Sequence, residues 1–349
     1  MQQDQSFNAL HQALGSSIKH NGTDYLYFGG TAYLGIPNNG AFLDLYAKGI
    51  KAYGLNNGTS RNNNVQLGIY SDAEKFAANK FGAAAALITS SGYLAAQLSV
   101  KKMAEFGEVI YSPVSHPALW IDQKPAEKRA FSEWTRDVMT RINESKQDNW
   151  VIISNSMNNL MPEKFDFSFV EHIDEKKEVV LIVDDSHGIG INNKGLGAFF
   201  SIPKPKNIEI LVVASMAKAL GVDAGLVLGS EKMIATLKQT DTFLGASPPA
   251  AAGLFAFMNA NQIYTDELVK LRNNMLLLNK KLKGNKEWHF IKDFPVYLSK
   301  NAELSERLVH QQILVSSFAY PDKDGPKINR IVLSSWHTDA EIERLINAL

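Results

Sequence analysis

Short apolar runs alternate with segments of helical periodicity up to about residue 250. The apolar runs are nearly continuous and do not alternate with polar residues, which is typical of strands buried on both faces of a parallel sheet. The pattern therefore predicts an α/β fold with a mainly parallel central sheet and helices on both faces. The expected strands are 84–90, 108–112, 150–156, 178–185, 208–215 and 225–230.

One helix is marked by sequence signals at both of its ends. Ser71 and Glu74 have the spacing of a capping box, in which the two side chains satisfy backbone amides of the first turn. Gly82 follows the last periodic position, where helices commonly end in a left-handed residue. We expect a helix over 71–82, and a second helix over 91–107 after the next strand.

The pattern changes after residue 250 and predicts a second domain. Long helical periodicity over 250–284 is followed by strand candidates at 288–299, 311–319 and 328–337, and by an amphipathic helix over 338–349. This mixture predicts a smaller α+β domain over 251–349 beside a large domain over 36–250. Residues 1–35 are expected to pack with the smaller domain.

Composition narrows the class of protein. Of the 349 residues, 45% are apolar, and 36 basic residues balance 36 acidic ones. A chain with this balance and no long basic run lacks the charge pattern of a nucleic-acid binder. The absence of cysteine excludes disulfides and thiolate sites. No apolar stretch of about 18 residues and no signal-peptide pattern is found, so we expect a cytoplasmic protein with small-molecule partners and no membrane contact.

Polar residues follow several of the expected strands, where open parallel sheets bind ligands. Ser90 to Tyr93 begin a helix whose amides could hold a phosphate, although an ordinary cap and turn would look the same. His116 follows the 108–112 strand and Ser156 ends the 150–156 strand. Taken singly, each of these residues fits a structural role equally well.

Asp184 and His187 stand out because they follow the buried run Val179–Val183. A carboxylate at such a position needs a cationic partner or several donors, since desolvation otherwise neutralises it. An ion pair and a divalent-metal site are the plain alternatives. A metal site would recruit further carboxylates from neighbouring strand ends, which supply serine and histidine here, so an organic cation is the better candidate and no metal is expected.

Lys218 follows another buried strand and lies among apolar residues. Such surroundings disfavour its charged form and make it a candidate Schiff-base amine, although a lysine that extends to solvent is the commoner case. Together, a lysine for an imine, Asp184 for a pyridinium nitrogen, and a helix start for a phosphate describe a site for pyridoxal 5′-phosphate.

The chain resembles the α-oxoamine synthases, a group of fold-type I pyridoxal phosphate enzymes. The resemblance is carried by "VDDSHGIG" (183–190) and "SMAKALG" (215–221), and extends in order along most of the chain. The further matching segments are "AYLGI" (32–36), "GTSR" (58–61), "SSGYLAA" (90–96), "SHPA" (115–118), "SPPAA" (247–251) and "RIVLSSWHT" (330–338).

The resemblance implies a role for each matching residue. Lys218 is the Schiff-base lysine, and Asp184 holds the pyridine nitrogen protonated. His187 and Ser156 approach the phenolic oxygen, and His116 stacks on the ring. The implied phosphate ligands are Ser91, Gly92, Tyr93 and Ser215. Arg330 is the implied ligand of the substrate carboxylate, a task that suits a guanidinium, and Asp185 is implied to be a structural neighbour.

The resemblance also implies the reaction and the assembly. A homodimer with active sites at the subunit interface would condense a small amino acid with an acyl-CoA, with loss of carbon dioxide. The motifs are most similar to the members of the biotin pathway, which implies alanine and a pimeloyl thioester.

Some positions depart from the family pattern. Val65, Tyr70 and Ala73 replace common residues of the second helix region, Gly245 replaces a common hydroxyl residue, and the N-terminal segment lacks an arginine-rich stretch. These departures leave an aminotransferase or an aldolase-type lyase as the alternative. A non-catalytic protein of the same fold is disfavoured by the presence of Lys218, Asp184 and His187 together.

Overall fold

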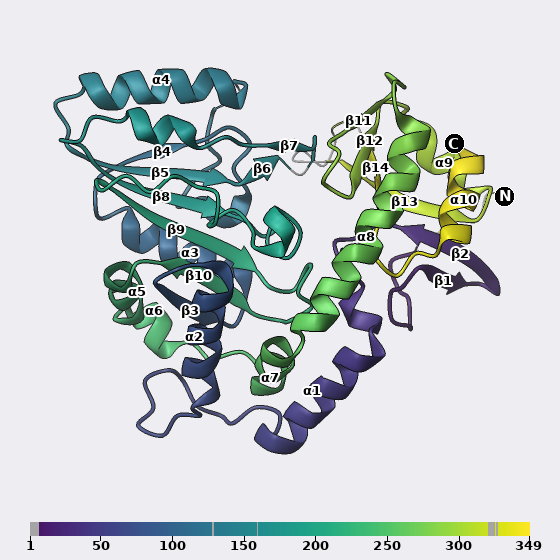
Figure 1. The fold of residues 1–349 in the computed structure, drawn as a ribbon, viewed down its shortest axis with the longest axis horizontal. Coiled ribbons are helices and arrows are strands. Elements are labelled where there is room, and N and C mark those ends of the chain that lie inside the picture. Colours follow the sequence, from purple (N-terminus) through teal and green to yellow (C-terminus); the bar gives the residue numbers. More distant parts are fainter. Residues whose placement is uncertain (1–6, 128, 159, 320–324, 326) are drawn as a thin grey trace. The chain divides into compact units, whose positions relative to one another are not determined.

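A computed structural model describes residues 7–127, 129–158, 160–319, 325 and 327–349. The chain forms two compact units (Figure 1). The central unit contains Ala41–Asn158 and Glu163–Tyr264, and the terminal unit contains the chain up to Gly40, residues 159–162 and Thr265–Leu349. The division into 1–35, 36–250 and 251–349 stays a prediction, and residues 1–6 of its first segment lie outside the described residues.

The central unit is built on a six-stranded sheet in the order β3, β10, β9, β8, β5, β4. The bounds are Ala85–Thr89 (β3), Glu108–Tyr111 (β4), Asn149–Asn155 (β5), Glu178–Asp184 (β8), Ile208–Ser215 (β9) and Gly225–Gly229 (β10). The pairs β4–β5, β5–β8 and β8–β9 are parallel, as the aliphatic runs predict. Strand β10 is antiparallel to both β9 and β3, because segment 216–224 is too short for a crossover connection.

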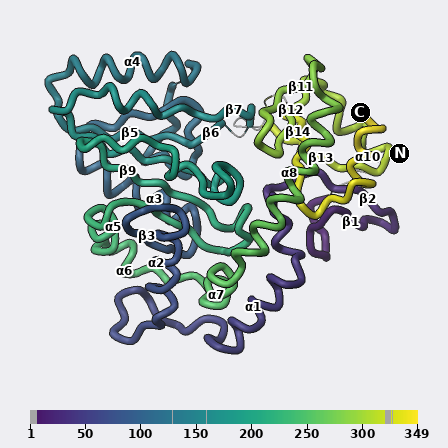
Figure 2. Tube along the Cα trace, in the orientation of Figure 1, coloured from purple at the N-terminus to yellow at the C-terminus, as the bar shows by residue number. Residues whose placement is uncertain are grey.

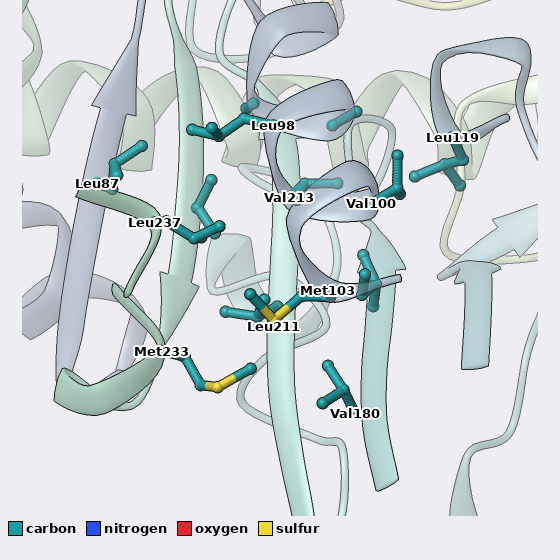
Figure 3. Packing of buried hydrophobic residues seen from close by; sticks show 14 of the residues in the cluster. Leu87, Leu98, Val100, Met103, Leu119, Val180, Leu211, Val213, Met233 and Leu237 are labelled. Atoms are coloured by element: carbon teal, nitrogen blue, oxygen red, sulfur yellow. The ribbon is translucent and has the colours of Figure 1, made fainter. Parts of the chain in front are cut away.

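Helix α3 (Gly92–Met103) packs on one face of this sheet. Leu98, Val100 and Met103 of the helix lie near Leu211 of β9 and Val180 of β8 in the same apolar cluster (Figure 3). All five of these side chains are at most 4% exposed. Burial of such side chains contributes roughly 1.5 to 3 kcal/mol each and fixes the start of α3 relative to the strand ends.

The described part of the central unit contains six further helices. They are α1 (Gly40–Tyr53), α2 (Ile69–Phe81), α4 (Phe131–Glu144), α5 (Glu231–Lys238), α6 (Asp241–Gly245) and α7 (Ala251–Asn259). Of these, α2 and α5 pack against strands of the sheet. Helix α4 buries Phe131 and Trp134 against the aromatic residues Phe165 and Phe169. A two-stranded hairpin, β6 (Met157–Asn158) with β7 (Glu163–Lys164), follows the sheet strand β5. Short 3-10 helices span Pro117–Leu119, Ser168–His172 and Asn193–Gly195.

Helix α2 confirms one of its predicted ends and corrects the other. Gly82 caps its C-terminus in the left-handed region, with φ 74°. The helix begins at Ile69, before the predicted capping box, and the Ser71 hydroxyl donates to the Gly68 carbonyl at 2.8 Å. Glu74 therefore does not cap the helix, because its side chain turns inward to a buried ion cluster.

That cluster joins three segments of the central unit. Glu74 is 4% exposed and accepts hydrogen bonds from Arg61 at 2.8 Å and from Lys238 of α5 at 2.6 Å. The Arg61 guanidinium lies between the rings of Tyr70 and Phe243, 5.1 and 5.0 Å from their centroids. Buried charges of this kind are stable only while every partner is present.

The terminal unit contains a second six-stranded sheet, in the order β1, β2, β13, β14, β12, β11. The bounds are Ser17–His20 (β1), Thr23–Phe28 (β2), Trp288–Phe290 (β11), Val296–Ser299 (β12), Ile313–Ala319 (β13) and Lys327–Val332 (β14). Figure 2 shows β2, near the N-terminus, beside β13, near the C-terminus, and this pair is parallel. The other neighbouring pairs are antiparallel.

Helices complete the terminal unit. Helix α8 (Asn261–Leu282) begins in the central unit's last residues, and α9 (Leu304–Val309) and α10 (Asp339–Ala348) follow. A short 3-10 helix spans Ile36–Asn38. Thr338 and Glu341 form a capping box at the start of α10. Within the described ranges, no helix is long and apolar enough to cross a membrane.

We expect Glu74→Gln to lower the free energy of unfolding by about 2 to 3 kcal/mol, because Arg61 and Lys238 would lose their shared carboxylate. Urea unfolding measures this change. The matched control is Glu105→Gln, which removes the ion pair between Lys102 and the Glu105 carboxylate, a side chain that is 65% exposed. This control should change the free energy of unfolding by less than about 0.5 kcal/mol. Equal effects of the two substitutions would contradict the importance of the buried cluster.

Candidate active site

Asp184 lies at the carboxyl end of β8, in the middle of the central sheet. Its Cα partners are Asn155 on β5 and Val213 on β9, so its position is fixed from both sides. One carboxylate oxygen accepts a hydrogen bond from the Ser186 amide at 2.8 Å. This local bond orients a half-buried negative charge at the edge where ligands of open sheets bind.

The structure brings Lys218 and His116 within electrostatic reach of Asp184. Burial lowers the pKa of Lys218, and the negative charge of Asp184 opposes this change. Burial also lowers the pKa of His116, while Asp184 raises it and Lys218 lowers it. An amine and an imidazole with lowered pKa values beside a carboxylate are typical of functional sites.

The His116 ring has one orientation fixed by the backbone. The residue precedes the 3-10 helix Pro117–Leu119, and its Nδ1 accepts a hydrogen bond from the Ala118 amide at 3.1 Å. Nδ1 therefore carries no proton in this arrangement, and the neutral ring has its proton on Nε2.

The start of α3 forms a cradle beside this group. The Ser91 hydroxyl caps the helix by accepting from the Leu94 amide at 3.1 Å. A Cβ placed on Gly92 would lie 2.5 Å from Ser215 Cβ and 2.6 Å from Ser215 Cα, so only glycine fits here. The first-turn amides of Gly92 and Tyr93 have no partner within a helix, and together with the helix dipole they suit an anion such as a phosphate.

Ser186 ties the cradle to the strand that carries Asp184. Its hydroxyl accepts a hydrogen bond from the Ser215 amide at 2.8 Å, while its own amide donates to Asp184. We did not single out this residue from the sequence. Its place between Asp184 and His187 was the available signal. The Tyr93 side chain is 63% exposed, so only its backbone faces the cradle.

Ser156 and Asp185 form a second polar group. The Ser156 amide donates to the Asp184 carbonyl at 2.8 Å, and the Ser156 hydroxyl lowers the pKa of the Asp185 carboxyl. Asp185 is 1% exposed, and its Oδ2 accepts from the Ala198 amide at 2.7 Å. Burial raises the pKa of Asp185 to about 7, against the lowering effects of Ser156 and Ala198. Ser156 also lines a cavity of about 280 Å³ with Lys164, Asn192 and neighbouring side chains.

His187 lies half-buried in the turn that follows Asp185. The amides of Gly188 and Ile189 both donate to the Asp185 carbonyl, at 3.0 and 2.9 Å. A Cβ on Gly188 would lie 2.1 Å from Asp185 Oδ1, which explains the glycine after His187. The predicted contact between His187 and a phenolic oxygen stays a prediction.

Arg330 lies on β14 of the terminal unit and is 6% exposed. Its guanidinium lies 5.0 Å from the centroid of the Phe318 ring. Burial lowers its pKa, and the nearby Tyr33 phenol raises it. These contacts fix the side chain within the terminal unit, and its predicted role toward a substrate carboxylate stays a prediction. Among the described residues, no three His, Cys, Asp or Glu side chains are grouped to hold a metal ion.

We expect Gly92→Ala to destabilise the fold by about 1 to 3 kcal/mol, because the added methyl group would overlap Ser215. Gly245→Ala is the matched control, since a Cβ on Gly245 in α6 meets nothing within 4 Å. Thermal unfolding of both variants tests the tight packing of the cradle. A Gly92→Ala protein as stable as the Gly245→Ala protein would show that the start of α3 is free to move.

Asp185 predicts a pH dependence of stability. Its pKa is about 7 in the folded chain, against an ordinary value of 3.8, so the folded state holds the proton more tightly. The resulting stabilisation is complete below the ordinary value and is lost as the pH rises through 7, at up to about 1.4 kcal/mol per pH unit. The stability of the wild type relative to Asp185→Asn should therefore fall between about pH 5 and pH 7, as measured by urea unfolding. A pH-independent difference would contradict it.

Comparison with known proteins places the chain in a family. A family model described as "Aminotransferase class I and II" matches residues 33–349. The 8-amino-7-oxononanoate synthase of Petrotoga mobilis is 26% identical over 97% of this chain and 91% of its own length. That of Dechloromonas aromatica is 27% identical over 97% of this chain and 93% of its own length.

Solved structures share the fold. A serine palmitoyltransferase from S. paucimobilis with bound PLP has a TM-score of 0.81 at 16% identity, covering 97% of this chain and 90% of the other. The 8-amino-7-oxononanoate synthase of Francisella tularensis has a TM-score of 0.70 at 19% identity, covering 93% and 96%.

These matches confirm the predicted fold-type I architecture and the predicted resemblance to the α-oxoamine synthases. The family model also confirms the expectation of a transferase. The chain belongs to the aminotransferase class I and II family.

Proposed function

We propose that this protein is an α-oxoamine synthase, a pyridoxal phosphate-dependent acyltransferase that joins a small amino acid to an acyl-CoA. The observation that carries the proposal is the grouping of Lys218, Asp184 and His116 at one sheet edge. Curated relatives over 97% of the chain support it. The specific reaction we propose is that of 8-amino-7-oxononanoate synthase, with alanine and a pimeloyl thioester.

The residues present fit the cofactor. The first-turn amides of the cradle at Gly92, where glycine allows close packing on Ser215, suit a phosphate, and we assign the Ser215 hydroxyl to the same phosphate. The carboxylate of Asp184 suits a protonated pyridine nitrogen, and His116 suits the face of the ring. We assign His187 and Ser156 to the phenolic oxygen, and Arg330 to the substrate carboxylate. When bound, pyridoxal phosphate withdraws electrons from the α-carbon of the amino acid.

Lys218 is the proton-transfer group in this proposal. Burial lowers the pKa of its amine, so a larger fraction is neutral and able to accept a proton. Its Nζ takes the proton from the α-carbon of the amino acid, and Asp184 keeps the positive charge of the site balanced. The overall reaction consumes an amino acid and an acyl thioester and releases an aminoketone, carbon dioxide and free coenzyme A.

An aminotransferase or aldolase-type lyase is the alternative function. Gly245 in α6 motivates it, because nothing lies within 4 Å of its Cβ position and the resemblance places a hydroxyl residue there. Val65, in the loop before α2, also departs from the family pattern, and it is 70% exposed. An aminotransferase would pass the amino group to an oxo acid and would release no thiol.

We further propose a homodimer with shared active sites, as the resemblance implies. Support comes from exposed apolar side chains on the central unit, where Leu55, Val65 and Tyr93 are 73%, 70% and 63% exposed. Contact with a second copy would remove this apolar surface from water.

Lys218→Ala should abolish the reaction, with a loss of at least about 1,000-fold, because no other group replaces its amine. The assay follows release of carbon dioxide and free thiol from alanine with acyl-CoA of increasing chain length. Lys232→Ala, an exposed lysine on α5, is the control and should retain full activity. Full activity of Lys218→Ala would refute the mechanism, and amino transfer to an oxo acid without thiol release would favour the alternative.

A further inference from the structure

Asn155 is a buried residue next to Ser156 that has no distinguishing signal in the sequence. It ends β5, is 7% exposed, and pairs with Asp184 on β8 in the sheet register. Residues alternate along a strand, so Asn155 faces the same side as Ile153, which packs in the cluster that contains α3. A buried carboxamide needs partners for both of its polar atoms.

Both partners of Asn155 belong to one short turn. Its Nδ2 donates to the Val114 carbonyl at 2.7 Å, and its Oδ1 accepts from the His116 amide at 3.1 Å. The two groups it binds are two positions apart in the chain, so a single carboxamide closes the turn that presents His116.

The backbone conformation of this turn is unfavourable for one of the residues that form it. Val114 has φ 52°, in the left-handed region, where a β-branched residue is rare because its side chain crowds the backbone. Its side chain is 50% exposed and so gains little from packing. The hydrogen bonds of Asn155 at both ends of the turn, together with the one from Trp120 Nε1 to the Ser115 carbonyl at 3.0 Å, oppose this strain.

We propose that Asn155 is a positioning residue that holds His116 at the cofactor ring by clamping the 114–116 turn. The proposal rests on the proposed function. Because Asn155 is also the sheet partner of Asp184, the clamp fixes the distance between the two side chains assigned to the ring face and to the ring nitrogen. A shift of His116 by about 1 Å should cost up to about 100-fold in turnover.

Asn155→Ala removes both hydrogen bonds and should release the turn. We expect turnover to fall about 10- to 100-fold while the KM for the amino acid changes less, since His116 contacts the cofactor. The second readout is the imidazole NMR titration of His116 in the protein without cofactor, assigned with His116→Gln. The groups that face this ring are Asp184 and Lys218. The pKa of His116, lowered by burial, should rise toward its ordinary value when the ring reaches solvent.

A rescue variant separates clamping from general stability. Glycine adopts a positive φ without strain, so Val114→Gly should restore much of the lost turnover and the wild-type titration when combined with Asn155→Ala. Asn155→Asp keeps an acceptor for His116 and loses the donor for Val114, so its loss should be intermediate. If Asn155→Ala does not fold, Asn155→Asp is judged by turnover and by its rescue with Val114→Gly, because its new carboxylate itself raises the pKa of His116.

Asn207→Ala is the matched control. Asn207 is a buried asparagine that also makes two hydrogen bonds, from its Nδ2 to the carbonyls of Asp174 and Lys177 at 3.1 and 2.9 Å. It should leave the titration of His116 unchanged. A His116 titration in Asn155→Ala that matches the wild type, or no rescue by Val114→Gly, would overturn the clamp. If the wild type with added pyridoxal phosphate gives no visible absorption that depends on Lys218, the proposed function fails, and the titration still decides the clamp.

Discussion

The charge of Asp184 at the end of a strand buried on both faces is the constraint on which the central unit depends. Val179 to Val183 are at most 1% exposed, so the carboxylate directly follows five apolar residues that are shielded from solvent. A charge in that position is stable only with donors or cations aimed at it. Here the Ser186 amide supplies a donor and Lys218 supplies an amine within electrostatic reach. Burial lowers the pKa of that amine, and the negative charge of Asp184 opposes this change.

The next residue along the strand shows the opposite solution to the same problem. Asp185 lies on the other side of the chain, where Ser156, the Ala198 amide and the charge of Lys164 lower its pKa by less than burial raises it. Burial raises its pKa, and its carboxyl accepts from the Ala198 amide and lies close to Gly188, where only a glycine leaves it room. The two neighbouring aspartates thus differ because successive side chains of a strand point to opposite faces, and so into different surroundings.

Much of this fold could be predicted from local patterns, and the parts that could not depend on contacts between distant residues. The strands around Asp184 and the C-terminal end of α2 at Gly82 follow from apolar runs and from backbone freedom. The place of β10 between β9 and β3 depends on pairing with a strand far away in the sequence, which the pattern does not reveal. Glu74 has the spacing of a capping residue, yet its side chain turns inward to Arg61 and Lys238. Only the tertiary fold brings these two cations close to it. Asn155 was missed because its partners lie 39 and 41 positions away and because a left-handed valine has no sequence signal.

The geometry of the candidate site is therefore a property of the sheet register as much as of the polar residues. Asn155, Asp184 and Val213 lie in one row across β5, β8 and β9, and Ser215, two residues beyond Val213, ends β9 against the glycine of the cradle. A slip of one residue between these strands would turn every side chain to the opposite face and would exchange Asp184 for Asp185 at the ligand edge. The packing of α3 against Val180 and Leu211 selects this register, because a slip would put side chains of the opposite face in their places. The core positions of these strands consequently determine the chemistry available at their ends, although none of them touches a ligand.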